Sequence, residues 1–187
     1  MHKRWWSVAC LPVSIFAAVL FSSSAAHAHD RDRDGREDRN FTLALDLDYA
    51  SAISNDLIEK GGGGALRIGS QLDLFLVTLI PELSLDYHSF GANENRDASV
   101  FTGKLGGRIR FLKIVEPGIF AHLGLGHIGG DREYSHTGVA FDAGVTVDLT
   151  IIPLIDLGLH AGWNRVFGGY DSGFSYGTAG VHAALVL

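Results

Sequence analysis

The stretch that most resembles a calcium-binding loop runs from residue 29 to residue 40 and reads HDRDRDGREDRN. Its aspartates alternate with other residues. Calcium-binding loops need carboxylates at alternating positions and a glycine for a sharp turn, and Gly35 follows the third aspartate here. The position that needs a bidentate glutamate holds Phe41, and four arginines neutralise the acids. We therefore expect a charged, solvated leader, with calcium binding as the alternative.

A histidine beside a serine could supply a general base and a hydroxyl nucleophile, and this combination occurs at His88-Ser89 and Ser135-His136. Adjacent residues of a strand point to opposite faces, so His88 cannot activate Ser89 within a strand. The second pair falls in an expected loop. The chain has no His-x-Ser, the spacing that would place both groups on one face. We expect no enzymatic activity and no catalytic residues.

The first 28 residues have the order of a secretory signal peptide, with Lys3 and Arg4, a mostly apolar run, and small residues ending at Ala28. A membrane anchor is the alternative, but the run includes Pro12 and is shorter than the roughly 20 residues that a span needs. The single cysteine lies in this segment, so we expect neither disulfides nor cysteine-bound metal afterwards. Removing its two basic residues leaves 13 of the 15 Lys and Arg against 21 Asp and Glu, which argues against nucleic-acid binding.

The elements that would position the remaining polar residues are β-strands. The sequence FTLALDLDY, from Phe41 to Tyr49, has leucine or an aromatic at every odd position and a small or polar residue at every even one. Because successive side chains of a strand point to opposite faces, this pattern indicates one apolar face and one face with two carboxylates. Turn signals divide the chain into eight such segments: Phe41–Ala50, Ala65–Phe75, Val77–His88, Ser99–Leu112, Gly118–His127, Val139–Thr150, Ile155–Arg165 and Ser175–Leu187.

The connections between these segments alternate between long, polar or glycine-rich loops and short apolar turns. The first long connection includes Gly61–Gly64, which we expect to be a flexible connector. Near the short turns, Pro81, Pro117 and Pro153 recur at intervals of 36 residues, which suits one hairpin with both of its connections. An even number of strands with short turns at one end and long loops at the other is typical of bacterial outer-membrane barrels.

In these eight segments and their alternating connections, the chain resembles the small eight-stranded OmpA/OmpX-type outer-membrane barrels. The resemblance implies an all-β, antiparallel, up-and-down transmembrane barrel over residues 41–187, after a signal peptide (1–28) and a periplasmic leader (29–40). It also implies a Gram-negative outer-membrane location, contact with lipid and lipopolysaccharide, and insertion by the barrel insertion machinery. A few small barrels modify lipid A, so a lipid A-modifying enzyme is an alternative.

The aromatic residues predict which face of the barrel meets lipid. They share the parity of the leucines and lie at two levels, near the two ends of the strands, as expected for girdles at the two interfaces of a bilayer. The alternative is a soluble, lipocalin-like periplasmic carrier with the same rings in its core. The expected girdle comprises Phe41, Tyr49, Tyr87, Phe101, Phe111, Phe141 and Trp163.

The opposite face should then line a lumen that side chains fill, because eight strands leave no open pore. Buried charges must be paired, and both signs are present on this face. The expected ion-pair network comprises Asp46, Asp48, Arg67, Asp73, Glu82, Asp86, Lys104, Arg108, Arg110, Asp142, Asp148 and Asp156. Gln71, His122, His160 and His182 share this face, and we expect the histidines to be hydrogen-bonded residues, with neither a metal nor another cofactor.

Equal residue sums suggest one register for two of these pairs. An antiparallel hairpin keeps the sum of opposing residue numbers constant, and Asp86 with Lys104 gives the same sum as Glu82 with Arg108. We therefore predict that both acid–base pairs lie directly opposite each other. The overall expectation is a non-enzymatic barrel with a structural or surface-interaction role and an unknown loop ligand.

Overall fold

The computed structural model describes residues 41–53, 58–74, 76–92, 98–112, 114–130, 135–152, 154–168 and 173–187. The expected signal peptide, the charged leader and its calcium-like motif lie outside these residues, as does most of the loop that follows residue 130.

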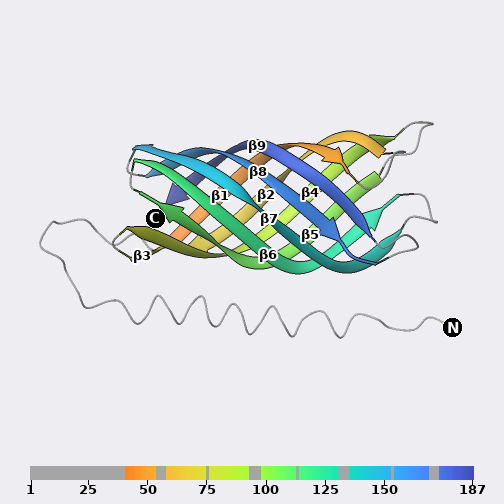
Figure 1. Ribbon diagram of the computed structural model, residues 1–187, viewed down its shortest axis with the longest axis horizontal. Helices are drawn as coiled ribbons and strands as arrows, with labels where there is room; N and C mark the ends of the chain where they lie inside the picture. The colour runs from red at the N-terminus through yellow and green to blue at the C-terminus, as the bar shows by residue number, and fades with distance from the viewer. Residues whose placement is uncertain are drawn as a thin grey trace, which may run out of the picture. The chain divides into compact units, whose positions relative to one another are not determined.

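Nine antiparallel strands in the described residues form one closed barrel (Figure 1). Strands that follow one another in sequence pair, except β2 and β3, which both pair with β4. The pairing of β1 with β9 completes the circle. No helix in the described part of the chain is long and apolar enough to cross a membrane. The strands are β1 (Phe41–Ala52), β2 (Ile58–Ser70), β3 (Leu72–Leu74), β4 (Val77–Ala92), β5 (Ala98–Phe111), β6 (Val115–Gly129), β7 (His136–Ile152), β8 (Ile155–Val166) and β9 (Phe174–Val186).

The barrel has eight strand positions, as the sequence predicts, because β3 continues β2 after Gln71 and pairs with the same strand, β4. The prediction of a flexible connector at Gly61–Gly64 is wrong, since all four glycines pair with β1 on one side and with β4 on the other. A Cβ on Gly63 would lie 2.2 Å from the carbonyl oxygen of Tyr87. Because glycine has no Cβ, it allows the two backbones to lie close together at this position.

The barrel is apolar outside and charged inside. In β1, Leu45 is 57% exposed, whereas the next residue, Asp46, is 6% exposed. In β8, Leu159 is 62% exposed, whereas Asp156 is 3% exposed. A soluble carrier would need the reverse arrangement, so the lipocalin-like alternative is wrong. Because side chains of a strand alternate between two faces, leucines that face lipid place the intervening charged residues inside the barrel.

The predicted girdle residues all belong to the outer, lipid-compatible face. Phe41 and Phe111 are exposed at the end with the short turns, and the others lie toward the loops. Phe141 is half-buried because its ring makes an edge contact with Trp163, at 6.0 Å between centroids. Two levels of aromatic side chains around an aliphatic band fit the two interfaces of a bilayer.

An apolar cluster fills the interior at the loop end, which the sequence analysis did not predict. The rings of Phe90, Phe174 and Tyr176 pack at 5.2–5.5 Å between centroids. We call this the apolar cap, which consists of Ala50, Phe90, Ala98, Val100, Ala140, Val166, Phe174 and Tyr176. It lies on the loop side of the charged residues.

A charge on the outer face should destabilise the barrel in proportion to its depth. Leu123 lies in the middle of β6 and is exposed, whereas Val115 begins the same strand. We expect Leu123→Arg to cost about 2–4 kcal/mol and Val115→Arg about 0–1 kcal/mol, because only the first places a cation near the bilayer midplane. Denaturant unfolding in phospholipid vesicles measures both, and equal, small losses would contradict a lipid-facing band.

Candidate functional site

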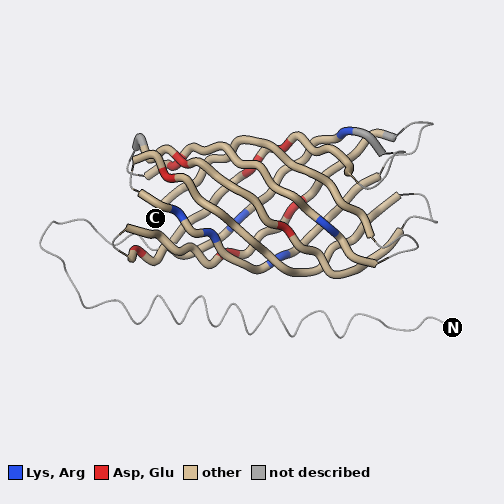
Figure 2. Tube along the Cα trace, in the orientation of Figure 1, with Lys and Arg blue, Asp and Glu red and all other residues tan. Residues whose placement is uncertain are grey.

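The candidate site is the charged lumen, to which every strand except β3 contributes a buried charged or histidine side chain. Acidic and basic residues occur on strands around the barrel (Figure 2). Alternation sends these side chains inward from eight backbones that surround them. The buried acidic, basic and histidine side chains of the described residues are Asp46, Asp48, Glu82, Asp86, Glu116, Asp142, Asp148 and Asp156, with Arg67, Lys104, Arg108 and Arg110, and His88, His122, His160 and His182.

Arg67 links β1 to β4. Its Nε donates to Asp46 Oδ2 at 2.8 Å and its Nη2 to Asp46 Oδ1 at 2.6 Å, which is a bidentate pair. Its Nη1 donates to Glu82 Oε2 at 3.3 Å. The planar guanidinium thus holds two carboxylates from two other strands, in the geometry that makes such pairs strong.

Lys104 and His122 form a second group in the middle of the lumen. Lys104 Nζ contacts Asp142 and lies 3.0 Å from Asp86 Oδ2. The ring of His122 lies between two carboxylates, with Nδ1 2.6 Å from Asp142 and Nε2 2.9 Å from Glu82. Both ring nitrogens therefore donate, which is the pattern of an imidazolium.

The predicted register of β4 and β5 is wrong by two residues. Asp86 lies opposite Thr102, and Lys104 lies opposite Ser84. The acid and the base nevertheless share the inner face and meet diagonally, because long side chains reach a neighbour two residues along the opposite strand. Thr102 and Ser84 each donate a hydrogen bond of 2.8 Å to the Asp86 carboxylate.

Two arginines occupy the turn end of the lumen. Arg110 Nη1 lies 2.8 Å from Asp156 and 3.3 Å from Glu116. Arg108 and Arg110 both approach Asp148, at 3.7 and 3.6 Å. Arg108 also lies 3.6 Å from Glu82 on the neighbouring strand. The turn-end and central groups are therefore continuous.

Asp73 is the one predicted network residue that the structure places elsewhere. It lies in β3, is exposed, and accepts a hydrogen bond of 2.6 Å from Thr78. Conversely, Glu116 and His88 belong to the lumen although neither was predicted in the network. Glu116 has the same parity as His122 in β6, so the alternation of inward and outward residues indicates that it faces the lumen.

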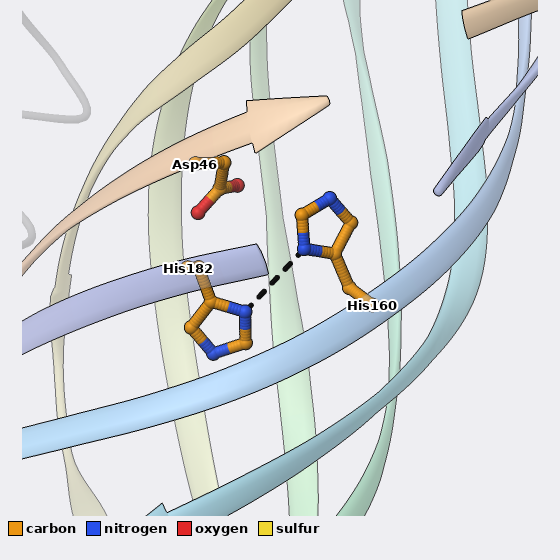
Figure 3. A group of neighbouring side chains, drawn as sticks. All are labelled: Asp46, His160 and His182. Atoms are coloured by element: carbon orange, nitrogen blue, oxygen red, sulfur yellow. Dashed lines mark hydrogen bonds between the residues drawn. The ribbon is translucent and has the colours of Figure 1, made fainter. Parts of the chain in front are cut away.

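Three further histidines join the network, with His88 and His160 on its loop side and His182 beside the turn-end group. His88 Nε2 and His160 Nε2 both contact Asp48, at 3.0 and 2.5 Å. His182 Nε2 lies 2.5 Å from Asp148. His160 and His182 also face each other, with 3.4 Å between their Nδ1 atoms, and Asp46 lies beside them (Figure 3).

Two small cavities lie among the described side chains of the lumen. A cavity of about 30 Å³ lies between the central group and Asp48, and one of about 20 Å³ lies among the turn-end residues. Each has room for roughly one or two water molecules. Charged side chains in these spaces therefore contact protein groups for the most part.

Removing a central cation should leave buried carboxylates without a partner. We expect Lys104→Met to lower the free energy of unfolding by about 3–5 kcal/mol, because Asp86 and Asp142 then lose their common counterion. Lys60→Met is the matched control, since Lys60 is exposed at the loop end, and it should change little. Denaturant unfolding in vesicles measures both variants. A loss for Lys104→Met no larger than that of the control would contradict the network.

Known structures share this fold at low sequence identity. Neisserial surface protein A is similar with a TM-score of 0.59 and 17% identity, over 79% of this chain and 97% of that one. Ail, the attachment invasion locus protein of Yersinia pestis, is similar with a TM-score of 0.55 and 13% identity, over 81% of this chain and 100% of that one. A second structure of Ail, in complex with the heparin analogue sucrose octasulfate, gives 0.50 and 14%, over 79% and 98%.

No protein-family model matches this chain, and no curated protein matches it. The closed antiparallel barrel, the apolar exterior with its aromatic girdles and the likeness to these structures agree with one another. The chain has the fold of the eight-stranded, OmpA-type outer-membrane β-barrels, and its apolar exterior suits a lipid bilayer.

Proposed function

We propose that this protein is a non-enzymatic component of the outer membrane, in which the lumen is a packed structural core and the loops make external contacts. The observation that carries the proposal is the filled lumen, whose larger described cavity is only about 30 Å³. The apolar cap lies across its loop end, where a conducting pore would need a polar opening. A structural or surface-interaction role needs no such opening.

The arrangement of histidine and serine residues supports the non-enzymatic part of the proposal. His88 is buried in the lumen, while the adjacent Ser89 is exposed on the outer face. The two side chains therefore point away from each other and form no nucleophile–base pair. Nothing in the described residues favours lipid A modification over the structural role.

The proposed external contacts rest on the outer surface of the barrel and on structurally similar proteins. The girdle and aliphatic band suit outer-membrane lipid and lipopolysaccharide, and assembly would require the barrel insertion machinery. One structural neighbour, Ail, is described as an attachment invasion locus protein. By analogy we assign the surface-interaction role of this chain to its four loops.

A sealed lumen predicts the absence of ion conductance. Planar-bilayer recordings of the refolded, heat-modifiable monomer should show no unitary current steps, because the ion pairs and the apolar cap fill the pore. A porin incorporated into the same bilayers is the positive control. Reproducible steps from the purified monomer would overturn the structural-core proposal.

The loop and turn ends should also differ in access from outside the cell. An epitope inserted between Glu133 and Tyr134, in the connection of β6 with β7, should be labelled on intact cells. The same epitope in the turn at residues 112–114 should be labelled only after the membrane is permeabilised. Heat-modifiable migration checks that both variants fold, and the reverse labelling pattern would contradict the proposed orientation.

A further inference from the structure

His160 and His182 face each other across adjacent strands at the centre of the barrel. In the pairing of β8 with β9, His160 lies opposite Gly180 and His182 lies opposite Gly158. A Cβ on Gly158 would lie 2.5 Å from the His182 ring, and one on Gly180 would lie 3.0 Å from the His160 ring. The two glycines thus provide the space in which the rings meet.

The outer nitrogen of each ring is held by a carboxylate. His160 Nε2 lies 2.5 Å from Asp48 Oδ1, and His182 Nε2 lies 2.5 Å from Asp148 Oδ1. Ionised carboxylates only accept hydrogen bonds, so each Nε2 carries the proton. A neutral imidazole with Nε2–H has its lone pair on Nδ1. A carboxylate that orients a histidine in this way is the usual support behind a metal-binding imidazole.

The two Nδ1 atoms therefore present lone pairs to each other, at 3.4 Å. Two acceptors at this distance need a proton or a cation between them. A tetrahedral zinc ion with Zn–N bonds of about 2.0–2.1 Å separates two ligand nitrogens by about 3.3–3.4 Å. The observed separation matches that value, and it lies at the long end for a hydrogen bond, since N–H···O bonds in proteins are about 2.7–3.2 Å.

A third donor group lies beside the pair. A carboxylate oxygen of Asp46 and one nitrogen of each histidine all lie within 4.8 Å of one another (Figure 3). Asp46 also accepts from Arg67, but each carboxylate oxygen has two lone pairs and can serve two partners. Both small cavities border this group, one at His182 and the other at Asp46 and His160, which leaves room for a further ligand such as water.

The charge balance of the lumen also favours a cation. Eight buried carboxylates face only four Lys and Arg among the described residues. His122, placed between two carboxylates, supplies one further positive charge. Uncompensated charges out of water are costly, so a divalent ion near Asp46, Asp48 and Asp148 would offset part of the remaining excess.

We propose that Asp46, His160 and His182 bind a divalent transition-metal ion, with zinc as the best-fitting ion, inside the barrel. Two imidazoles with one carboxylate are typical zinc ligands, and an open fourth position suits water. Asp48 and Asp148 are positioning residues that orient the two rings. The ion joins β1, β8 and β9 and is a structural element of the lumen.

The test uses the full barrel, refolded in detergent after chelator treatment and exposed to equimolar zinc chloride. After removal of free metal, we expect about one zinc per folded barrel by elemental analysis, and X-ray absorption should show two nitrogen ligands at about 2.0–2.1 Å. Cobalt chloride should give the visible absorption bands of tetrahedral Co²⁺. Folded protein without bound zinc would mean that the histidines share a proton, and would overturn the proposal.

Variants separate this site from other histidines. His160→Gln and His182→Gln should each abolish stoichiometric zinc binding, and Asp148→Asn should weaken it by about 10–100-fold. His122→Gln and His127→Gln are matched controls. Both ring nitrogens of His122 are held by carboxylates, and the side chain of His127 is exposed on the outer face. Zinc binding that persists in folded His160→Gln and His182→Gln, or an absorption spectrum of the wild type with only oxygen ligands, would overturn the assignment.

Discussion

The structure depends on one constraint, which is that the charges inside the barrel must be paired within the lumen. Neither hydrocarbon outside nor bulk water is available to the lumen of an eight-stranded barrel. Each of the four buried Lys and Arg residues therefore contacts two or more carboxylates. Acids still outnumber these bases, and each of the four buried histidines contacts at least one carboxylate.

The same constraint divides the lumen into two zones. The centre and the turn end hold the ion pairs, whereas the loop end is closed by the apolar cap. Tyr176 and His88 lie at the boundary, with 3.5 Å between the phenolic oxygen and the His88 Nδ1, so the cap and the network are in contact. The apolar zone keeps external water from competing for the charged groups, and this makes each ion pair stronger.

Sequence alternation was enough to predict the two faces, because a strand offers only two. It did not determine the register, since Asp86 and Lys104 meet equally well as diagonal neighbours as they would directly opposite each other. The apolar cap was missed although Phe90, Val100 and Tyr176 share the parity of the lumen residues, because apolar side chains as a class were assigned to lipid. The approach of His160 to His182 depends on strand pairing and on glycines opposite the rings, which no spacing within one segment encodes.

The pairing of β1 with β9 has a consequence for biogenesis. Phe41 and Leu187 exchange backbone hydrogen bonds of 2.8 and 3.1 Å, so the first strand obtains its second partner only from the last one. During synthesis and export, nearly the whole barrel sequence must emerge before this seam can form. Until then β1 presents a free ladder edge, which is an aggregation hazard, and such distant pairing is slow. A cell that makes this protein must therefore shield the nascent chain on its way to the membrane.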